Sequence, residues 1–293
     1  MSSNAHRPWT RDGWGLGGAL LFLVGALLPI GFSLGYAAAY SVGWTGLMAD
    51  GFTLAHWRAV LGTPVVWWSL GWSVYLAATV VVLTVMLALA LALYLRRPLE
   101  YGALSYVIYF PLALPATVAA FLVFQLFAES GYMARIALAL GVIEQASAFP
   151  SVVHDRYGIG ILLAHLGLTV PFFTLLFVQI YNGERVDALK GTAFALGASR
   201  WQALRRITLP LLLRRSRTNI ALLFIATLGS YEIPLLLGRQ SPEMLSVLTL
   251  RKFQRFNLGD RPEAFIVALL YTAFVLSVLV YTFRYARPSE VTT

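Results

Sequence analysis

Residues 187–210, DALKGTAFALGASRWQALRRITLP, form a basic, helix-prone stretch that separates two long apolar runs of the chain. Gly197 tolerates the backbone angles of a sharp turn, and Pro210 favours a helix boundary because it lacks an N–H and has a fixed φ. Side chains beyond the glycine recur on one side at helical spacing, namely Trp201, Leu204, Ile207 and Thr208. The stretch predicts a helix, a turn and a second helix at a membrane surface, a position typical of a docking site.

The composition of the whole chain indicates a membrane protein. Of its 293 residues, 59% are hydrophobic and only 12% are charged, and the mean hydropathy is +0.73. An ordinary soluble domain is less apolar than this. The formal charge of +9 is typical of a membrane protein that retains Lys and Arg on its cytoplasmic side, so we expect no nucleic-acid partner.

The apolar runs predict an all-α integral membrane fold with six transmembrane helices. The first run is longer than the apolar core of a signal peptide, so we expect an uncleaved helix. The predicted membrane domain covers residues 14–287, between cytoplasmic tails at 1–13 and 288–293. The six runs lie at about 14–39, 70–95, 104–127, 158–181, 220–237 and 264–283.

Proline residues interrupt two of these runs. Pro111 and Pro115 lie in the third run, and Pro171 lies in the fourth. Each proline removes a backbone hydrogen bond, so the freed carbonyls must be satisfied by neighbouring helices or by a wet cavity. The pair predicts a kink in the third helix, which serves either packing or a functional hinge.

The distribution of charge predicts the orientation of the chain. Most of the 22 Lys and Arg residues fall in segments expected to be cytoplasmic, including Arg96, Arg97 and the loop 182–216 between the fourth and fifth helices. We therefore expect both termini in the cytoplasm. Segments 129–157 and 238–263 are expected outside. The first contains a short amphipathic piece, and the second is basic and predicts a surface-lying helix or a contact with an acidic partner.

A single acidic residue, Glu232, lies within the predicted spans. A carboxylate at the centre of a membrane helix costs about 2.5–3.5 kcal/mol on insertion scales and is usually kept for a cavity or pathway. Tyr231 and Pro234 belong to the same candidate translocation pathway because a break at the proline exposes backbone groups; a hydrated position at the outer interface is the alternative for the carboxylate. Gln125 and His165 are further pathway candidates, and a satisfied interhelical hydrogen bond is the favoured interpretation of each.

The sequence lacks the residue patterns of an enzyme or a metal site. Cys is absent, and the four His residues show no spacing typical of metal ligands. The phosphate-binding pattern G-x-x-x-x-G-K-[ST] is also missing. We expect no catalytic residue, no metal and no cofactor in this chain, so any energy from ATP must come from a separate subunit.

The central stretch resembles the EAA loop of ABC importer permeases. The family pattern is E-A-A, three residues, Gly, nine residues and I-x-L-P, and its second half matches Gly197 and Ile207-Thr208-Leu209-Pro210. The E-A-A positions fall on Gly191, Thr192 and Ala193, so the acidic residue is absent here. Further stretches resemble the six-helix type I permeases that serve polyamines, ferric iron, thiamine and sulfate: GFTLAHWRAVL at 51–61, FPLALPATVAAFLVF at 110–124 and SYEIPLLLG at 230–238.

This resemblance implies a multi-pass permease subunit of the bacterial cytoplasmic (inner) membrane. Its implied partners are two ABC ATPase subunits that bind ATP and Mg, a second permease chain in a homodimer or heterodimer, a solute-binding protein and membrane lipid. A coupling helix in the central loop would contact the ATPase through residues at Thr192, Ala193, Leu196, Gly197, Ala198, Arg200, Trp201, Leu204, Ile207, Leu209 and Pro210. A stand-alone secondary transporter or channel driven by an ion gradient is the alternative function.

Overall fold

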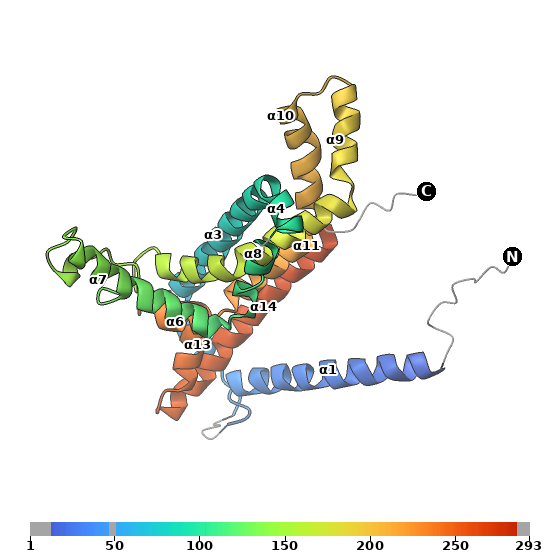
Figure 1. Ribbon diagram of the computed structural model, residues 1–293. Coiled ribbons are helices and arrows are strands. Elements are labelled where there is room, and N and C mark those ends of the chain that lie inside the picture. Colours follow the sequence, from blue (N-terminus) through green and yellow to red (C-terminus); the bar gives the residue numbers. More distant parts are fainter. Residues whose placement is uncertain (1–12, 47–50, 103, 286–293) are drawn as a thin grey trace. The chain divides into compact units, whose positions relative to one another are not determined.

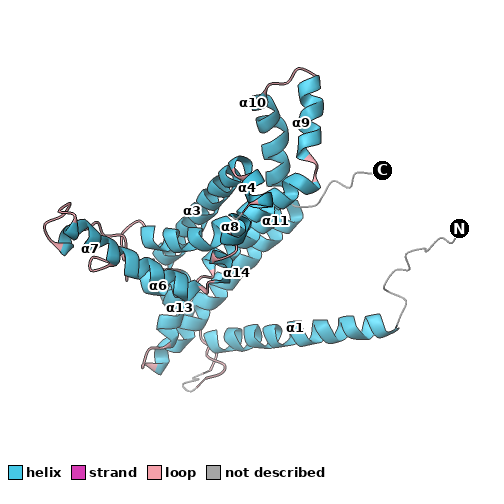
Figure 2. Ribbon diagram, in the orientation of Figure 1, coloured by secondary structure: helices cyan, strands magenta, loops and turns pink. Residues whose placement is uncertain are grey.

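The computed structural model describes residues 13–46, 51–102 and 104–285. Helices and connecting loops make up this part of the chain, and no strand occurs in it (Figure 2). The predicted all-α class is therefore confirmed. The expected tails at 1–13 and 288–293 lie outside the described residues except for Gly13, which begins the first helix.

Five segments of the described chain are long and apolar enough to cross a membrane, whereas the sequence predicted six. Four are single helices that closely follow predicted runs. The fifth, Ala116–Ala139, comprises two shorter helices, α6 and α7. These elements are α1 (Gly13–Ser41), α3 (Pro64–Tyr94), α6 (Ala116–Phe127), α7 (Tyr132–Ala139), α8 (Ile159–Gly183) and α14 (Arg261–Tyr285).

The predicted third span, 104–127, is broken and not merely kinked. It divides into α5 (Leu104–Val107), the short 3-10 helix η2 (Pro111–Ala113) and α6. Leu114, which precedes a proline, is extended with ψ 127°, because the pyrrolidine ring disfavours the helical region for the residue before it. Pro115 is also extended and forms the N-cap of α6. Pro111 thus begins η2, and Pro115, four residues later, separates η2 from α6.

The predicted fifth span, 220–237, is also divided between two helices. α11 (Leu209–Leu228) begins earlier than expected and carries three arginines in its first half, and α12 (Glu232–Leu237) follows after a break at Gly229. α11 therefore has a mixed composition and is not among the five candidate spans. The apolar run alone did not show that the helix extends back into the basic loop.

Short helices occupy the connections between these elements. The amphipathic piece expected in the external segment 129–157 is α7, but it belongs to the candidate span Ala116–Ala139. The basic segment 238–263 contains α13 and η5. The remaining connecting helices are α2 (Ala55–Gly62), α4 (Arg96–Tyr101), η3 (Ala146–Ala148), α13 (Leu245–Phe253) and η5 (Leu258–Asp260).

The chain divides into two compact units. One unit contains Met1–Thr63 and Arg251–Tyr271, and the other contains Pro64–Leu250 and Thr272–Thr293. The central basic stretch and all predicted site residues belong to the second unit.

Aromatic and ionic contacts hold the first unit together. The ring centroids of Tyr40 and Phe265 lie 4.6 Å apart, and Phe253 meets Phe265 edge-on at 5.8 Å. The Lys252 ammonium donates a hydrogen bond to the Glu263 carboxylate over 2.5 Å. The cationic group on the basic segment thus has an anionic partner within the same unit.

Packing of α3 against α8 forms the centre of the second unit. Small side chains on α3 are buried at intervals of about one helical turn, which allows the two backbones to approach closely. Thr84 and Thr169 join the helices through hydroxyl oxygens 2.7 Å apart. Thr169 already donates to the carbonyl of His165, so Thr84 is the donor between the helices. The small buried residues of α3 are Ser69, Ser73, Ala77, Thr84, Ala88 and Ala92.

Two apolar clusters extend this packing along α8. The first surrounds Phe173 and Phe177 and includes Leu212 of α11. The second surrounds Ile161 and includes Leu237 of α12 and Ala120 of α6. η2 and α6 of the third predicted span, and α11 and α12 of the fifth, are therefore packed against the same continuous helix (Figure 1).

A capped loop fixes the start of α8. The Asp155 carboxylate accepts hydrogen bonds from the backbone N–H groups of Tyr157 and Ile159, each over 2.7 Å. His154 lies in the left-handed region, and its backbone N–H donates to the carbonyl of Leu237. This loop satisfies polar groups at the first turn of α8 and at the last turn of α12.

Replacement of Ala77 by Leu should destabilise the second unit. Ala77 is fully buried, and inserting a larger side chain into a packed interior typically costs about 1–3 kcal/mol. Ala78 is exposed one position along α3, so Ala78→Leu is the matched control and should leave stability unchanged. Thermal unfolding of both variants in detergent measures the difference. Equal unfolding temperatures for the two variants would contradict the close packing of α3.

Candidate functional site

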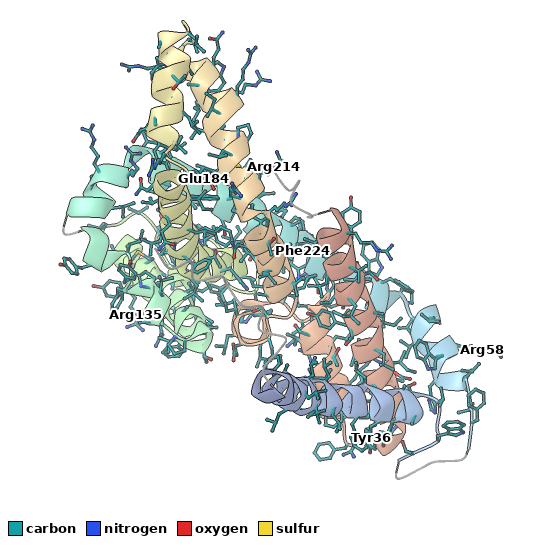
Figure 3. All side chains as sticks on the ribbon, turned by 90° about the vertical axis from the view of Figure 1, so that its right-hand side faces the viewer. Tyr36, Arg58, Arg135, Glu184, Arg214 and Phe224 are labelled. Carbon is teal, nitrogen blue, oxygen red and sulfur yellow. The ribbon has the colours of Figure 1, made fainter. Side chains whose placement is uncertain are left out.

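The central basic stretch folds into a helical hairpin. α9 (Val186–Ala195) leads to a turn at Gly197, and α10 (Arg200–Ala203) continues through one π-helical turn, η4 (Leu204–Thr208), into α11. α9 and α10 lie side by side and project beyond the ends of α3 and α8 (Figures 1 and 3). The predicted helix, turn and second helix are therefore present. We call residues 186–208 the hairpin.

Two local features hold the turn of the hairpin. Gly197 has φ +86°, a left-handed conformation that strains residues with a side chain, although no other atom lies within 4 Å of a Cβ placed there. The constraint at this position is therefore conformational and not steric crowding. Ser199 and Gln202 form a reciprocal capping box at the start of α10, with bonds of 2.8 and 3.2 Å. The S-x-x-Q spacing was a signal for this cap that the sequence analysis did not use.

Large apolar side chains are exposed at the outer end of the hairpin. Leu196 is 83% exposed and Trp201 is 64% exposed, whereas Ala203 and Thr208 are almost completely buried. Trp201 and Thr208, which share one side at helical spacing, therefore differ in burial, because the packed side runs through Ala203 and Thr208. Exposed apolar groups in a basic surrounding are typical of a protein contact surface.

A cluster of polar groups anchors the base of the hairpin. Tyr181, near the end of α8, donates a hydrogen bond over 2.7 Å to Asp187 in the first turn of α9. Asp187 also forms an ion pair over 2.8 Å with Arg96, the first residue of α4. The Arg96 guanidinium lies over the Tyr181 ring, 4.2 Å from its centroid. This anchor cluster therefore joins the consecutive helices α8 and α9 to α4, which is distant in sequence.

Charge and hydrogen bonding shift the ionisation of Asp187. Its partial burial alone would raise the pKa, but the hydrogen bonds from Tyr181 and Arg96 and the nearby positive charges lower the pKa below its usual value. A depressed carboxylate pKa stabilises the folded anchor at neutral pH, and this contribution is lost as the pH falls through the lowered pKa. In the sequence Arg96 marks only the end of an apolar run, and no local pattern predicts the anchor cluster.

A second ion pair supports the hairpin base. Arg215 of α11 approaches Glu184, which ends α8, with an Nε–Oε1 distance of 2.7 Å. Arg185, the next residue, has φ +49° and reverses the chain into α9. Glu184 and Arg214 mark this base in Figure 3. This ion pair thus connects the segments of the chain that enter and leave the hairpin.

Three of the predicted pathway residues lie at the break between α11 and α12. Glu232 is exposed as the first residue of α12, and its side chain forms no hydrogen bond or ion pair within the described ranges. Tyr231 is half-buried against the second apolar cluster, and Pro234 is buried. The carboxylate therefore starts a short helix and does not lie at the centre of a continuous one.

The other two pathway candidates differ in their environment. His165 is buried in α8, and its Nδ1 lies 2.9 Å from the carbonyl oxygen of Ile161. His165 therefore bonds within its own helix, and the interhelical hydrogen bond that the sequence favoured for it is not found among the described residues. Gln125 is exposed on α6 and makes no side-chain hydrogen bond with the described part of the chain. The structure does not bring Gln125 and Glu232 into one polar group.

A cavity of about 430 Å³ lies at the break in the third predicted span. It is lined by η2, by the middle of α8 and by the middle of α11, and its polar side chains are Thr169 and Asn219. None of the five predicted pathway residues lines this cavity. Sequence reasoning missed it because its walls come from three separate segments. The described residues hold no group of three or more His, Asp or Glu side chains placed for a metal.

Comparison with known proteins gives a consistent set of similarities. Residues 84–288 match the family described as "Binding-protein-dependent transport system inner membrane component". A permease protein named PhnV, assigned to a 2-aminoethylphosphonate transport system of Salmonella typhimurium, is 27% identical over 277 residues, which cover 92% of this chain and 93% of the relative. The sulfate transport system permease protein CysT of Synechocystis is 23% identical over 172 residues, covering 58% of this chain and 56% of CysT.

Solved structures share the fold. A bacterial alginate ABC transporter in complex with an alginate pentasaccharide-bound periplasmic protein contains a chain with a TM-score of 0.68 and 16% identity. The superposition covers 94% of both chains. A second structure of a bacterial ABC transporter that imports alginate gives the same TM-score at 17% identity.

Removal of the Tyr181 hydroxyl should loosen the hairpin without unfolding the bundle. Tyr181→Phe keeps the ring beneath Arg96 but removes the donor to Asp187, a loss of about 1 kcal/mol that corresponds to about fivefold faster amide exchange in α9. Hydrogen exchange measured by mass spectrometry follows this change. Tyr106→Phe, at a tyrosine that is 82% exposed, is the control. Unchanged exchange in α9 would show that the anchor cluster does not hold the hairpin.

Proposed function

This chain belongs to the family of inner membrane components of binding-protein-dependent transport systems and is thus the permease subunit of an ABC importer, and we propose that its hairpin couples it to a partner ATPase. The hairpin transmits the conformational change that ATP hydrolysis drives in that partner. The proposal rests on the exposed Leu196 and Trp201 at the outer end of the hairpin. These side chains offer an apolar contact to a partner protein. Family membership disfavours the stand-alone secondary transporter that was the alternative.

The partner at this surface is an ABC ATPase subunit. This sequence contains no P-loop pattern, so ATP and Mg bind to the partner and not to this chain. In the proposed assembly two permease chains pair across a solute pathway, and each hairpin contacts one of two ATPases. A solute-binding protein delivers the solute on the opposite side of the membrane.

The hairpin is proposed to lie in the cytoplasm of a bacterial cell, because ATP is available there. Its basic residues agree with retention of positive charge on that side. α11 contains 20 residues and is about 30 Å long, which matches the hydrocarbon thickness. We propose that α11 and α12 together make one further crossing, with the arginines of α11 nearer the hairpin. Six crossings in total would leave both termini in the cytoplasm.

The geometry of the hairpin suits transmission of movement. The capping box and the left-handed glycine make a short, defined turn, and the anchor cluster ties its base to α8 and α4. A push on Leu196 and Trp201 therefore reaches the ends of membrane helices through fixed contacts. ATP and the loaded binding protein must both favour the outward-open state for this movement to shift the population.

The solute pathway is proposed to run along the broken helices. The cavity beside η2 provides the hydroxyl of Thr169, the amide of Asn219 and a wall that lacks regular helix hydrogen bonding. Non-helical backbone at membrane depth is tolerated where it is buried in protein or lines a water-filled space. Glu232 at the α12 break remains a proposed pathway residue near one end.

Truncation of Trp201 tests the docking surface. Trp201→Ala should weaken binding of the ATPase subunit about 30-fold, because a central aromatic anchor typically contributes 2 kcal/mol or more. The affinity is measured with purified permease and ATPase in nanodiscs. Trp44→Ala is the control, since Trp44 is 69% exposed in the other unit. Equal affinities of the two variants and the unmodified chain would refute docking at the hairpin.

Substitution of Gly197 tests whether the turn transmits movement. A β-branched residue at φ +86° carries a strain of about 1–3 kcal/mol, so Gly197→Val should reduce solute uptake about tenfold or more while the membrane helices stay folded. Gly191→Val is the matched control: Gly191 lies within α9 and no atom lies within 4 Å of an added Cβ. Normal uptake by the Gly197 variant in vesicles would contradict the proposed role of the turn.

A further inference from the structure

A second and larger pocket lies at the base of the hairpin. Its volume is about 940 Å³, and it is bounded by the ends of α3 and α8, by α4, and by both arms of the hairpin. The candidate spans α3 and α8 end at Tyr94 and Gly183, so the pocket lies where these helices leave the membrane. We call it the base pocket.

The base pocket carries an excess of positive charge. Four cationic residues line it, Arg96, Arg97, Lys190 and Arg200, against the single carboxylate of Asp187. That carboxylate is already engaged by Arg96 and by the Tyr181 hydroxyl. Lys190 donates a hydrogen bond over 3.3 Å to the same hydroxyl, which is neutral. The pocket therefore holds more cationic groups than its own anion can neutralise.

Two of these cations have no anionic partner in the described ranges of the chain. Arg97 and Arg200 are both exposed, and neither forms an ion pair with described residues. They come from different elements, α4 and α10, and approach the pocket from two sides. An anion in the pocket would be contacted by guanidinium groups of separate helices, which favours a group with several acceptor oxygens.

A buried hydroxyl without a partner points to the same ligand. Thr208 lines the pocket and is only 1% exposed, yet its Oγ1 has no hydrogen-bond partner among the described residues. Thr169 and Thr174 in α8 instead donate to the carbonyl four residues earlier. A buried hydroxyl left unbonded costs about 1–3 kcal/mol, so a ligand oxygen at this place would be stabilised.

The remaining wall of the base pocket is apolar. Ala92, Leu93, Phe194 and Leu204 contribute to it, and the first two belong to a membrane-crossing helix. An inorganic anion would leave this wall unused. A ligand that carries a phosphate group next to an acyl chain would satisfy both walls, and basic pockets between membrane helices are known to accept such head groups.

We propose that the base pocket binds the phosphate group of an anionic phospholipid from the leaflet on the hairpin side of the membrane. This inference rests on the proposed orientation of the permease. The bound phosphate would bridge α4 and α10 through Arg97 and Arg200 and would add a lipid contact to the anchor cluster. Coupling between the ATPase and the membrane helices would then depend on anionic lipid.

Native mass spectrometry of the purified full-length chain tests the proposal. The chain in detergent is titrated with phosphatidylglycerol and, separately, with zwitterionic phosphatidylcholine. We expect preferential binding of phosphatidylglycerol. Arg97→Gln should weaken it about fivefold, because each basic residue near an anionic group contributes about this factor. Arg205→Gln is the matched control, since Arg205 is an exposed hairpin arginine that does not line the pocket.

Competition with inorganic phosphate identifies the source of the anion. If millimolar inorganic phosphate displaces phosphatidylglycerol, the pocket binds a soluble anion and the lipid proposal is overturned. Equal binding of both lipids, or an equal effect of the Arg97 and Arg205 variants, also overturns it. Lys190→Gln is a second variant that should weaken phosphatidylglycerol binding. If neither pocket variant changes this binding, the proposed site is overturned. The titration contains no ATPase, so its result is independent of docking at Trp201.

Discussion

Close packing of α3 against α8 supports the rest of the second unit. Membrane helices gain little from the hydrophobic effect when they associate, since lipid tails are as apolar as their side chains, so contact depends on shape and on hydrogen bonds. The small residues of α3 supply the shape, and the pair Thr84–Thr169 supplies a polar link. α8 then offers its other sides to α6, α11 and α12. Without this pairing the shorter pieces would lack a continuous helix to pack on.

The broken helices are compatible with a membrane because their pieces pack against α8. A backbone that leaves the helical path exposes N–H and C=O groups, which lipid cannot satisfy. The breaks at Pro111–Pro115 and at Gly229 lie beside pieces that pack against α8, and a cavity with hydroxyl and amide groups adjoins the first of them. The irregular backbone that a permease can use for solute contact is thus placed against protein.

The hairpin shows a division between an outer and an inner surface. Its outer end exposes Leu196 and Trp201, while its base is tied by Asp187 to Tyr181 and Arg96. The base pocket lies beside that anchor and adds Arg97 and Arg200, which form no ion pair with the described residues. The proposed docking, transmission and lipid contact therefore all involve the hairpin, and each uses different side chains, with Arg97 of α4 added for the lipid.

The sequence by itself determined the membrane class, the approximate positions of four long apolar helices and the turn at Gly197, because hydropathy, glycine and proline act locally. It also indicated the family through the spacing from Gly197 to Pro210. Only the tertiary structure decided that the third and fifth predicted spans are broken, that Trp201 is exposed, and that Arg96, Tyr181 and Asp187 meet. These outcomes depend on contacts between segments far apart in the chain, and periodicity within one segment carries no information about which partner covers it.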